Sequence, residues 1–75
     1  MKILNFTVVI TPDASGGYVV TCPALPGLVT EGDTIEDARA MGADAIRGYL
    51  ESLQKDGEPI PTDDSITEQL AIEVA

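Results

Sequence analysis

The sequence predicts an α+β fold in which three β-strands precede one long helix and a fourth strand follows it. Three segments before residue 33 are rich in β-branched residues or alternate apolar and polar side chains, which is typical of strands. Residues 35–56 instead carry apolar side chains three and four positions apart, which is typical of an amphipathic helix. The expected order is β-β-β-α-β: a four-stranded, mostly antiparallel sheet with one long helix packed on one face.

The first two strands are expected to form a hairpin. Residues 3–11, ILNFTVVIT, place apolar side chains at alternate positions, so one face of this strand should be buried. Residues 12–17, PDASGG, are a dense turn signal, and residues 18–22, YVVTC, form the second strand. Because the connection is short, the two strands should pair with each other.

The segment CPALPGL, residues 22–28, is expected to be a turn rather than a ligand loop. Pro23 has no N–H, so the second strand should end there. Pro26-Gly27 suits the two central positions of a type II turn, because proline fixes its φ and glycine accepts a positive one. Leu25 should plug one end of the core, and residues 28–31, LVTE, should form the third strand.

Clear signals mark both ends of the helix expected over residues 35–56. Thr34 is the predicted N-cap, and Asp37 stands where a capping box has its acidic residue. Gly57 suits the position after the helix, and two prolines beyond it forbid continuation. Gly42 and Gly48 weaken the helix by about 1 kcal/mol each relative to alanine, so we interpret them as sites where the helix approaches the sheet closely.

The last segment, residues 65–75, is the predicted fourth strand. It contains helix-forming residues, but it is short for a terminal helix, and Leu70, Ile72 and Val74 alternate with smaller or polar residues. A right-handed crossover through the helix would place it in the same sheet.

The small size of the domain and the apolar residues on both sides of the second strand predict self-association. The chain of 75 residues is a single small domain, 44% of whose residues are hydrophobic, and a domain this short buries only about 60% of its unfolded surface. One helix covers one face of a sheet, yet both sides of residues 18–22 are largely apolar. We therefore expect a homo-oligomer, a dimer or a tetramer.

The formal net charge of −9 argues against direct binding to nucleic acid. Only two of the 13 acidic residues, Asp13 and Glu31, precede residue 33. The uneven distribution favours a basic protein partner docking on the acidic half. The candidate partner-binding residues cluster where the third strand leads into the helix: Glu31, Asp33, Glu36 and Asp37.

The sequence lacks the residues that most catalytic and metal-binding sites need. The chain has no histidine and a single cysteine, which excludes a Ser-His-Asp triad, a zinc site and an internal disulfide. No base can activate Cys22, so we interpret it as a packed residue at a strand end. The sequence predicts no enzyme, cofactor or metal, no membrane segment and a cytoplasmic location.

Residues 18–61 resemble the HicB family of antitoxin-like proteins. The shared pattern is a C-P-x-L-P-G turn at residues 22–27, a T-x-G-D-T-x-E-D-A helix start at residues 30–38, and a helix end with Gly57 and Ile60-Pro61. The similarity extends over about residues 3–75.

The resemblance implies a partial ribonuclease-H-like fold and a binding role: neutralising a small basic RNA-cleaving toxin of the HicA type. Such antitoxins often carry a C-terminal DNA-binding module, and we expect residues 1–75 to be a single HicB-like domain without one. A nuclease would need a metal-binding carboxylate on the first strand. Residues 2–12 contain no acidic residue, which argues against nuclease activity. The alternative is a stand-alone oligomeric protein with no toxin, acting in regulation or in binding a small ligand.

Overall fold

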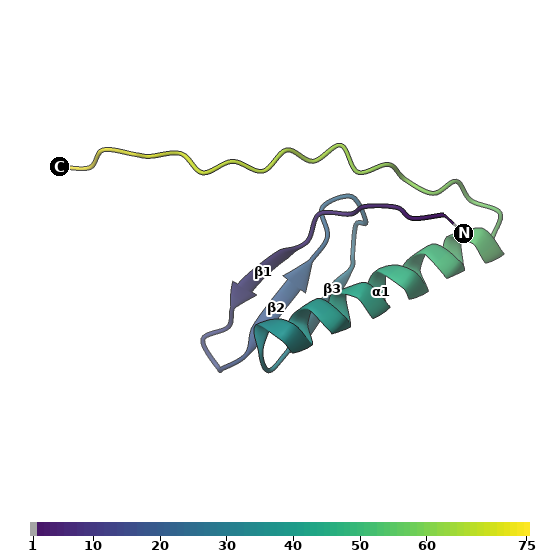
Figure 1. The fold of residues 1–75 in the computed structure, drawn as a ribbon, viewed down its shortest axis with the longest axis horizontal. Helices are drawn as coiled ribbons and strands as arrows, with labels where there is room; N and C mark the ends of the chain where they lie inside the picture. The colour runs from purple at the N-terminus through teal and green to yellow at the C-terminus, as the bar shows by residue number, and fades with distance from the viewer. Residues whose placement is uncertain (1) are drawn as a thin grey trace.

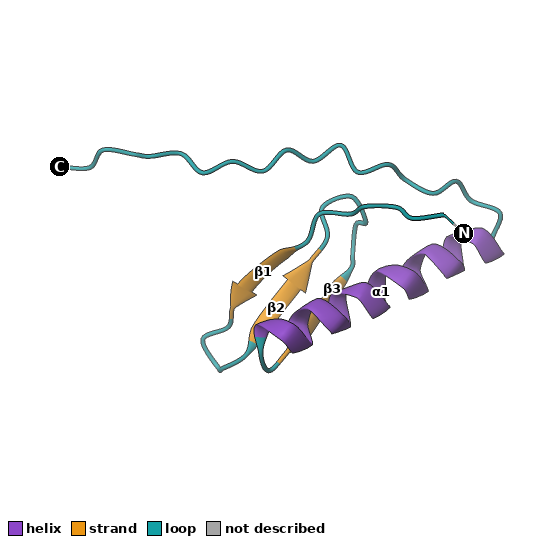
Figure 2. Cartoon of the chain, in the orientation of Figure 1, coloured by secondary structure: helices purple, strands orange, loops and turns teal. Residues whose placement is uncertain are grey.

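A computed structural model of the chain describes residues 2–75 and contains a three-stranded sheet with one helix across it. The strands are β1 (Val9–Pro12), β2 (Tyr18–Thr21) and β3 (Val29–Gly32), and the helix is α1 (Ile35–Lys55). The sheet order is β1-β2-β3, with both pairs antiparallel. Helix α1 packs on β2 and β3 (Figures 1 and 2), so the predicted α+β class and the first four elements are confirmed.

The face of the sheet under α1 is closely packed. The register places Ile10, Val20 and Thr30 side by side on this face, and Val20 is fully buried. A Cβ atom added to Gly42 would lie 3.2 Å from Cγ1 of Val20, which confirms close approach at this glycine. At Gly48 nothing lies within 4 Å of such an atom, so the same interpretation is wrong there.

The opposite face of the sheet has no helix on it. By the same register, Thr21 lies between Val9 and Val29, and Val19 lies beside Glu31. Val9 and Val29 are 43% and 67% exposed. Three valines thus lie on the face that the fold leaves uncovered.

The core depends on the loop between β2 and β3 more than on the strands. Cys22, Leu25 and Leu28 form a buried cluster, on which Tyr49 and Leu50 of α1 pack. Leu25 is fully buried, as predicted. The turn has the expected geometry: Gly27 has a φ of 84°, and the N–H of Leu28 donates to the carbonyl of Leu25 at 3.2 Å.

Both helix ends have the predicted caps. The hydroxyl of Thr34 accepts a hydrogen bond from the N–H of Asp37 at 3.0 Å. Past the other end, Gly57 has a φ of 69°. The N–H of Gly57 donates to Gln54 at 3.1 Å and that of Glu58 to Leu53 at 2.9 Å, which satisfies carbonyls that the last turn leaves without a partner.

The first strand is shorter than predicted. Only Val9–Pro12 pairs with β2, whereas the alternation predicted residues 3–11. Strand β2 ends at Thr21 because the chain turns away at Pro23, so residues 3–8 have no strand beside them on that side. Phe6 and Val8 still pack against the core cluster.

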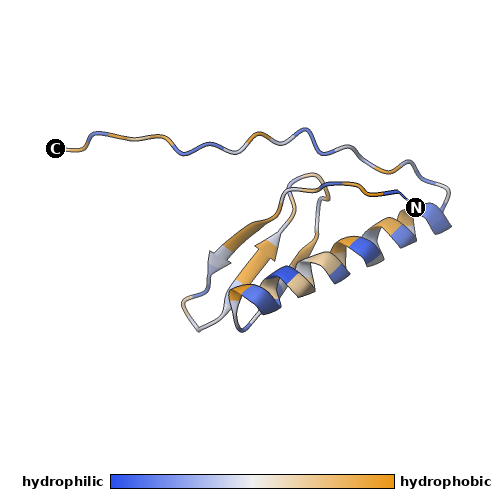
Figure 3. Ribbon diagram, in the orientation of Figure 1, coloured by the Kyte–Doolittle hydropathy of each residue, from blue (hydrophilic) through white to orange (hydrophobic). Residues whose placement is uncertain are grey.

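The predicted fourth strand is absent from the described chain, and this part of the prediction is wrong. Residues 58–75, here called the tail, belong to no helix or strand and run past β1 and beyond the sheet (Figure 1). Pro59 and Pro61 cannot donate to a ladder. The tail is held near its start by one hydrogen bond, from the N–H of Thr7 to the carboxylate of Asp63. Figure 3 shows both hydrophobic and hydrophilic stretches along the tail, and alternation of larger apolar residues with small or charged ones begins at residue 70.

Candidate functional site

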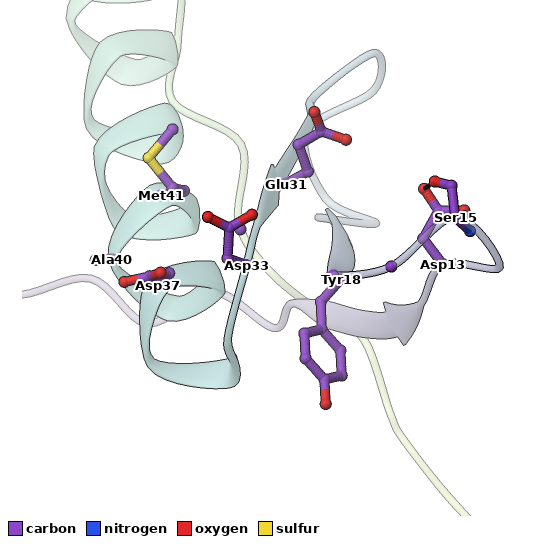
Figure 4. A pocket seen from close by; sticks show the side chains of 11 residues that line it. Asp13, Ser15, Tyr18, Glu31, Asp33, Asp37, Ala40 and Met41 are labelled. Atoms are coloured by element: carbon purple, nitrogen blue, oxygen red, sulfur yellow. Dashed lines mark hydrogen bonds between the residues drawn. The ribbon is translucent and has the colours of Figure 1, made fainter.

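A hollow lined by four carboxylates lies where the β1–β2 turn, the end of β3 and the first turn of α1 meet (Figure 4). We call it the acidic hollow. Its acids come from three separate elements: Asp13 from the hairpin turn, Glu31 and Asp33 from the end of β3, and Asp37 from the helix. Ser15, Tyr18 and Met41 complete its wall.

Glycine backbone allows these elements to approach. Gly17 has a φ of 75°, and a Cβ atom there would lie 2.9 Å from the carbonyl oxygen of Gly32. A Cβ atom on Gly32 would lie 2.5 Å from the backbone nitrogen of Ala38 in α1. Real Cβ atoms do not tolerate such distances, so both positions require glycine. The two glycines thereby set the width of the acidic hollow.

Three of the four predicted partner-binding residues line the hollow together. These are Glu31, Asp33 and Asp37, and Figure 4 shows them around the junction of β3 and α1. Glu36 is exposed on the same first turn of the helix but does not line the hollow.

Asp13 is the acidic residue of this site that the sequence reasoning missed. It joins the others because the register pairs Tyr18 with Gly32, which brings the hairpin turn beside the end of β3. The turn-forming residues 12–17 placed Asp13 in a hairpin turn. Its position beside Glu31 and Asp33 follows only from the pairing of β2 with β3.

Among residues 2–75, no ion pair joins a carboxylate of the hollow to a cation. All four carboxylate side chains are exposed. The ion pair found within residues 2–75 joins Arg47 to Asp44 at 2.8 Å, on the helix and outside the hollow. The Asp13 carboxylate accepts hydrogen bonds from Ser15, from its hydroxyl at 3.1 Å and its N–H at 3.4 Å.

The exposed carboxylates give the hollow a negative potential toward solvent. In the described part of the chain, no three histidine, cysteine, aspartate or glutamate residues lie close enough together to hold a metal ion. Cys22 lies outside the hollow, 3% exposed in the core, which confirms that it is a packed residue. No helix within residues 2–75 is long and apolar enough to cross a membrane.

Comparison with known proteins places the chain in a family. Residues 6–73 match the profile described as "HicB_like antitoxin of bacterial toxin-antitoxin system". The chain belongs to this HicB-like antitoxin family. The resemblance drawn from the C-P-x-L-P-G turn and the helix start is therefore confirmed.

Relatives of similar length and longer antitoxins both match. A UPF0150 protein of Thermoplasma acidophilum is 48% identical over 62 residues, which cover 83% of this chain and 90% of that protein. A UPF0150 protein of Synechocystis is 40% identical over 71 residues, covering 95% of this chain and 90% of that one. Antitoxin HicB 1 of Photorhabdus laumondii is 38% identical over 61 residues, covering 81% of this chain but 39% of the antitoxin.

Proposed function

We propose that this HicB-like chain neutralises a small, basic, RNA-cleaving toxin of the HicA type by binding it directly in the cytoplasm, without catalysis of its own. The observation that carries the proposal is the acidic hollow, in which carboxylates from three elements face solvent and, among residues 2–75, no cation pairs with Glu31, Asp33 or Asp37. Family membership favours the same role, because the family profile describes antitoxins.

The hollow suits the long side chains of a basic protein. Lysine and arginine can place a charged head among the carboxylates while their aliphatic stems lie along an apolar wall. Met41, which is 44% exposed, supplies such a wall. Glu36, beside the hollow, adds to the negative potential that would steer the toxin during encounter.

A charge-neutralising pair of variants tests this proposal. The double change Asp33→Asn with Glu36→Gln removes two charges without altering side-chain size, and it spares Asp37, whose N–H is part of the helix cap. The matched control, Glu51→Gln with Glu58→Gln, removes two exposed charges near the far end of α1. The toxin to use is a basic, histidine-containing protein of similar size encoded beside this chain, in an inactivated form.

Association rate is measured against ionic strength. We expect the Asp33/Glu36 variant to associate several-fold more slowly than the parent at low salt, and the control to follow the parent closely. All three should converge near 1 M salt, where the Debye length is about 3 Å. Equal rates for both variants across the salt range would remove Asp33 and Glu36 from the interface. No binding at any salt would favour the stand-alone alternative.

A further inference from the structure

A second hollow lies between the segment before β1 and the second half of α1 (Figure 1). It is lined by residues 2–6 and, on the helix, by Ala43, Ile46, Arg47 and Leu50. Its volume of about 610 Å³ falls within the range of about 300–1,000 Å³ that is usual for sites of small organic molecules. It shares no lining residue with the acidic hollow. We call it the basic groove.

The walls of the basic groove are largely apolar. Phe6, Ile46 and Leu50 are its more buried part, because each also packs against the core cluster. Ile3 and Leu4 line it as well and are 81% and 44% exposed. A ligand with a hydrocarbon part can cover these side chains, which removes apolar surface of both partners from water.

The charge of the basic groove is opposite to that of the chain. Two of its lining residues, Lys2 and Arg47, are cations and none is acidic, although the chain has 13 acidic residues and 4 basic ones. Nη1 of Arg47 donates to the carboxylate of Asp44 at 2.8 Å. A guanidinium has five N–H donors, so this contact leaves Arg47 able to bind a further anion.

We propose that the basic groove binds a small amphipathic monocarboxylate, with its hydrocarbon part on the apolar walls and its carboxylate on Arg47 and Lys2. A carboxylate matches the planar donors of a guanidinium. The net charge of −9 repels anions at long range, and repels those with several charges most. A ligand with a single charge and an apolar body is therefore favoured over phosphates and nucleic acids. The function is separate from toxin binding, because the two hollows share no residue.

The surroundings of the basic groove orient the ligand. A neighbouring hollow shares most of the groove's lining residues and extends to the start of the tail. Its wall adds two apolar residues, Ile60 and Pro61, and two acidic ones, Glu51 and Asp63. The acids repel a carboxylate on this side, whereas the apolar pair can accommodate the end of a hydrocarbon chain. We therefore expect the hydrocarbon chain to point toward Ile60 and Pro61.

Three related ligands test the charge and the hydrocarbon part. Octanoate, hexanoate and octanol are titrated into the full chain below any micelle-forming concentration, and binding is followed by amide chemical shifts. Octanoate should saturate and shift the amides of residues 2–6 and 43–50. Hexanoate should bind about five- to fifteenfold more weakly, because it has fewer methylene groups to bury. Octanol should bind about tenfold more weakly, because it lacks the charge that strengthens a hydrogen bond from arginine.

Changes at Arg47 and at its neighbour should move octanoate affinity in opposite directions. Arg47→Gln should weaken binding about tenfold. The matched control, Arg39→Gln, removes an exposed cation of α1 outside the groove and should leave binding unchanged. Asp44→Asn releases Arg47 from its ion pair and should strengthen binding about two- to fivefold. All three residues are exposed, so the variants should keep the circular dichroism of the parent.

A second pair of variants tests the apolar wall. Leu4 lines the groove, whereas Leu70, which is 76% exposed in the tail, does not. Leu4→Ser should weaken octanoate binding about fivefold, because it removes apolar contact area. Leu70→Ser should bind octanoate as the parent does.

Three results would overturn the proposal. The first is the absence of saturable shifts with octanoate at millimolar concentration. The second is octanol binding as tightly as octanoate, or equal affinities for Arg47→Gln and Arg39→Gln, because the carboxylate would then not be recognised. The third is an acidic, apolar peptide that shifts these amides when octanoate does not, because the groove would then be a protein interface. None of these results bears on toxin binding at the acidic hollow.

Discussion

The body of the protein, residues 6–57, and its tail both contain extended segments rich in apolar residues. Residues of this kind form the buried core of the body but are exposed in the tail. Val20 is fully buried in the body, whereas Ile72 in the tail is 73% exposed. Both lie in extended segments rich in apolar residues. The difference is that β2 has a strand on each side and a helix above it, while the tail has neither. Burial of an apolar segment therefore depends on which elements lie beside it.

The comparison predicts its largest effect for a pair of large-to-small substitutions. Leu25→Ala should lower the free energy of unfolding by about 2–5 kcal/mol, because a fully buried leucine leaves a cavity. Ile66→Ala, at a tail residue that is 86% exposed, should change it by less than about 0.5 kcal/mol. Urea denaturation followed by circular dichroism measures both. Equal losses would mean that the tail is packed as tightly as the body.

Two glycines sharpen the comparison within the body. Gly32→Ala should cost about 1–3 kcal/mol, because its Cβ would meet the backbone of α1 at 2.5 Å. Gly48→Ala should instead stabilise the protein by up to about 1 kcal/mol, since nothing lies within 4 Å of the new atom. Thermal unfolding midpoints compare the two. A stabilised Gly32→Ala variant would show that β3 and α1 are not in close contact.

The smallest expected effect is the loss, at low pH, of the hydrogen bond that holds the start of the tail. Hydrogen bonds from the hydroxyl and N–H of Ser65, and from the N–H of Thr7, hold the pKa of the Asp63 carboxyl below its ordinary value of 3.8. A lowered pKa in the folded chain means that the attachment stabilises at pH above this value and is lost as pH falls below it.

The amide resonance of Thr7 reports this attachment. It should be constant between pH 7 and pH 4, within the range above the ordinary carboxyl pKa of 3.8, and should move at lower pH. In Asp63→Asn the movement should disappear. A Thr7 resonance that moves equally in parent and variant would show that Asp63 does not hold the tail.

Local chemistry made most of the body predictable. Pro26-Gly27 fixed the turn that buries Leu25, and Thr34 and Gly57 fixed the helix ends, because each depends on residues within a few positions of one another. The fourth strand was not predictable in this way, since a strand needs a neighbour and alternation does not say which.

Part of the candidate site could likewise be predicted from local sequence, and part could not. Three of its acids, Glu31, Asp33 and Asp37, are close in sequence, so a run of charges at a strand-to-helix junction was enough to find them. Asp13 lies 18 positions before Glu31 and joins them through the pairing of β2 with β3. Asp13 lines the hollow because of the sheet register, and no local sequence pattern predicts that register.

The positions of the two tyrosines give the molecule a built-in optical readout. The chain has no tryptophan and two tyrosines, so its tyrosine emission is not obscured by an indole and comes from these two rings. Tyr49 donates its hydroxyl hydrogen to the carbonyl of Pro26 at 3.0 Å and thus reports on the contact between α1 and the β2–β3 loop. Tyr18 lines the acidic hollow. In a Tyr49→Phe chain the remaining emission would follow occupancy of the hollow, without any attached dye.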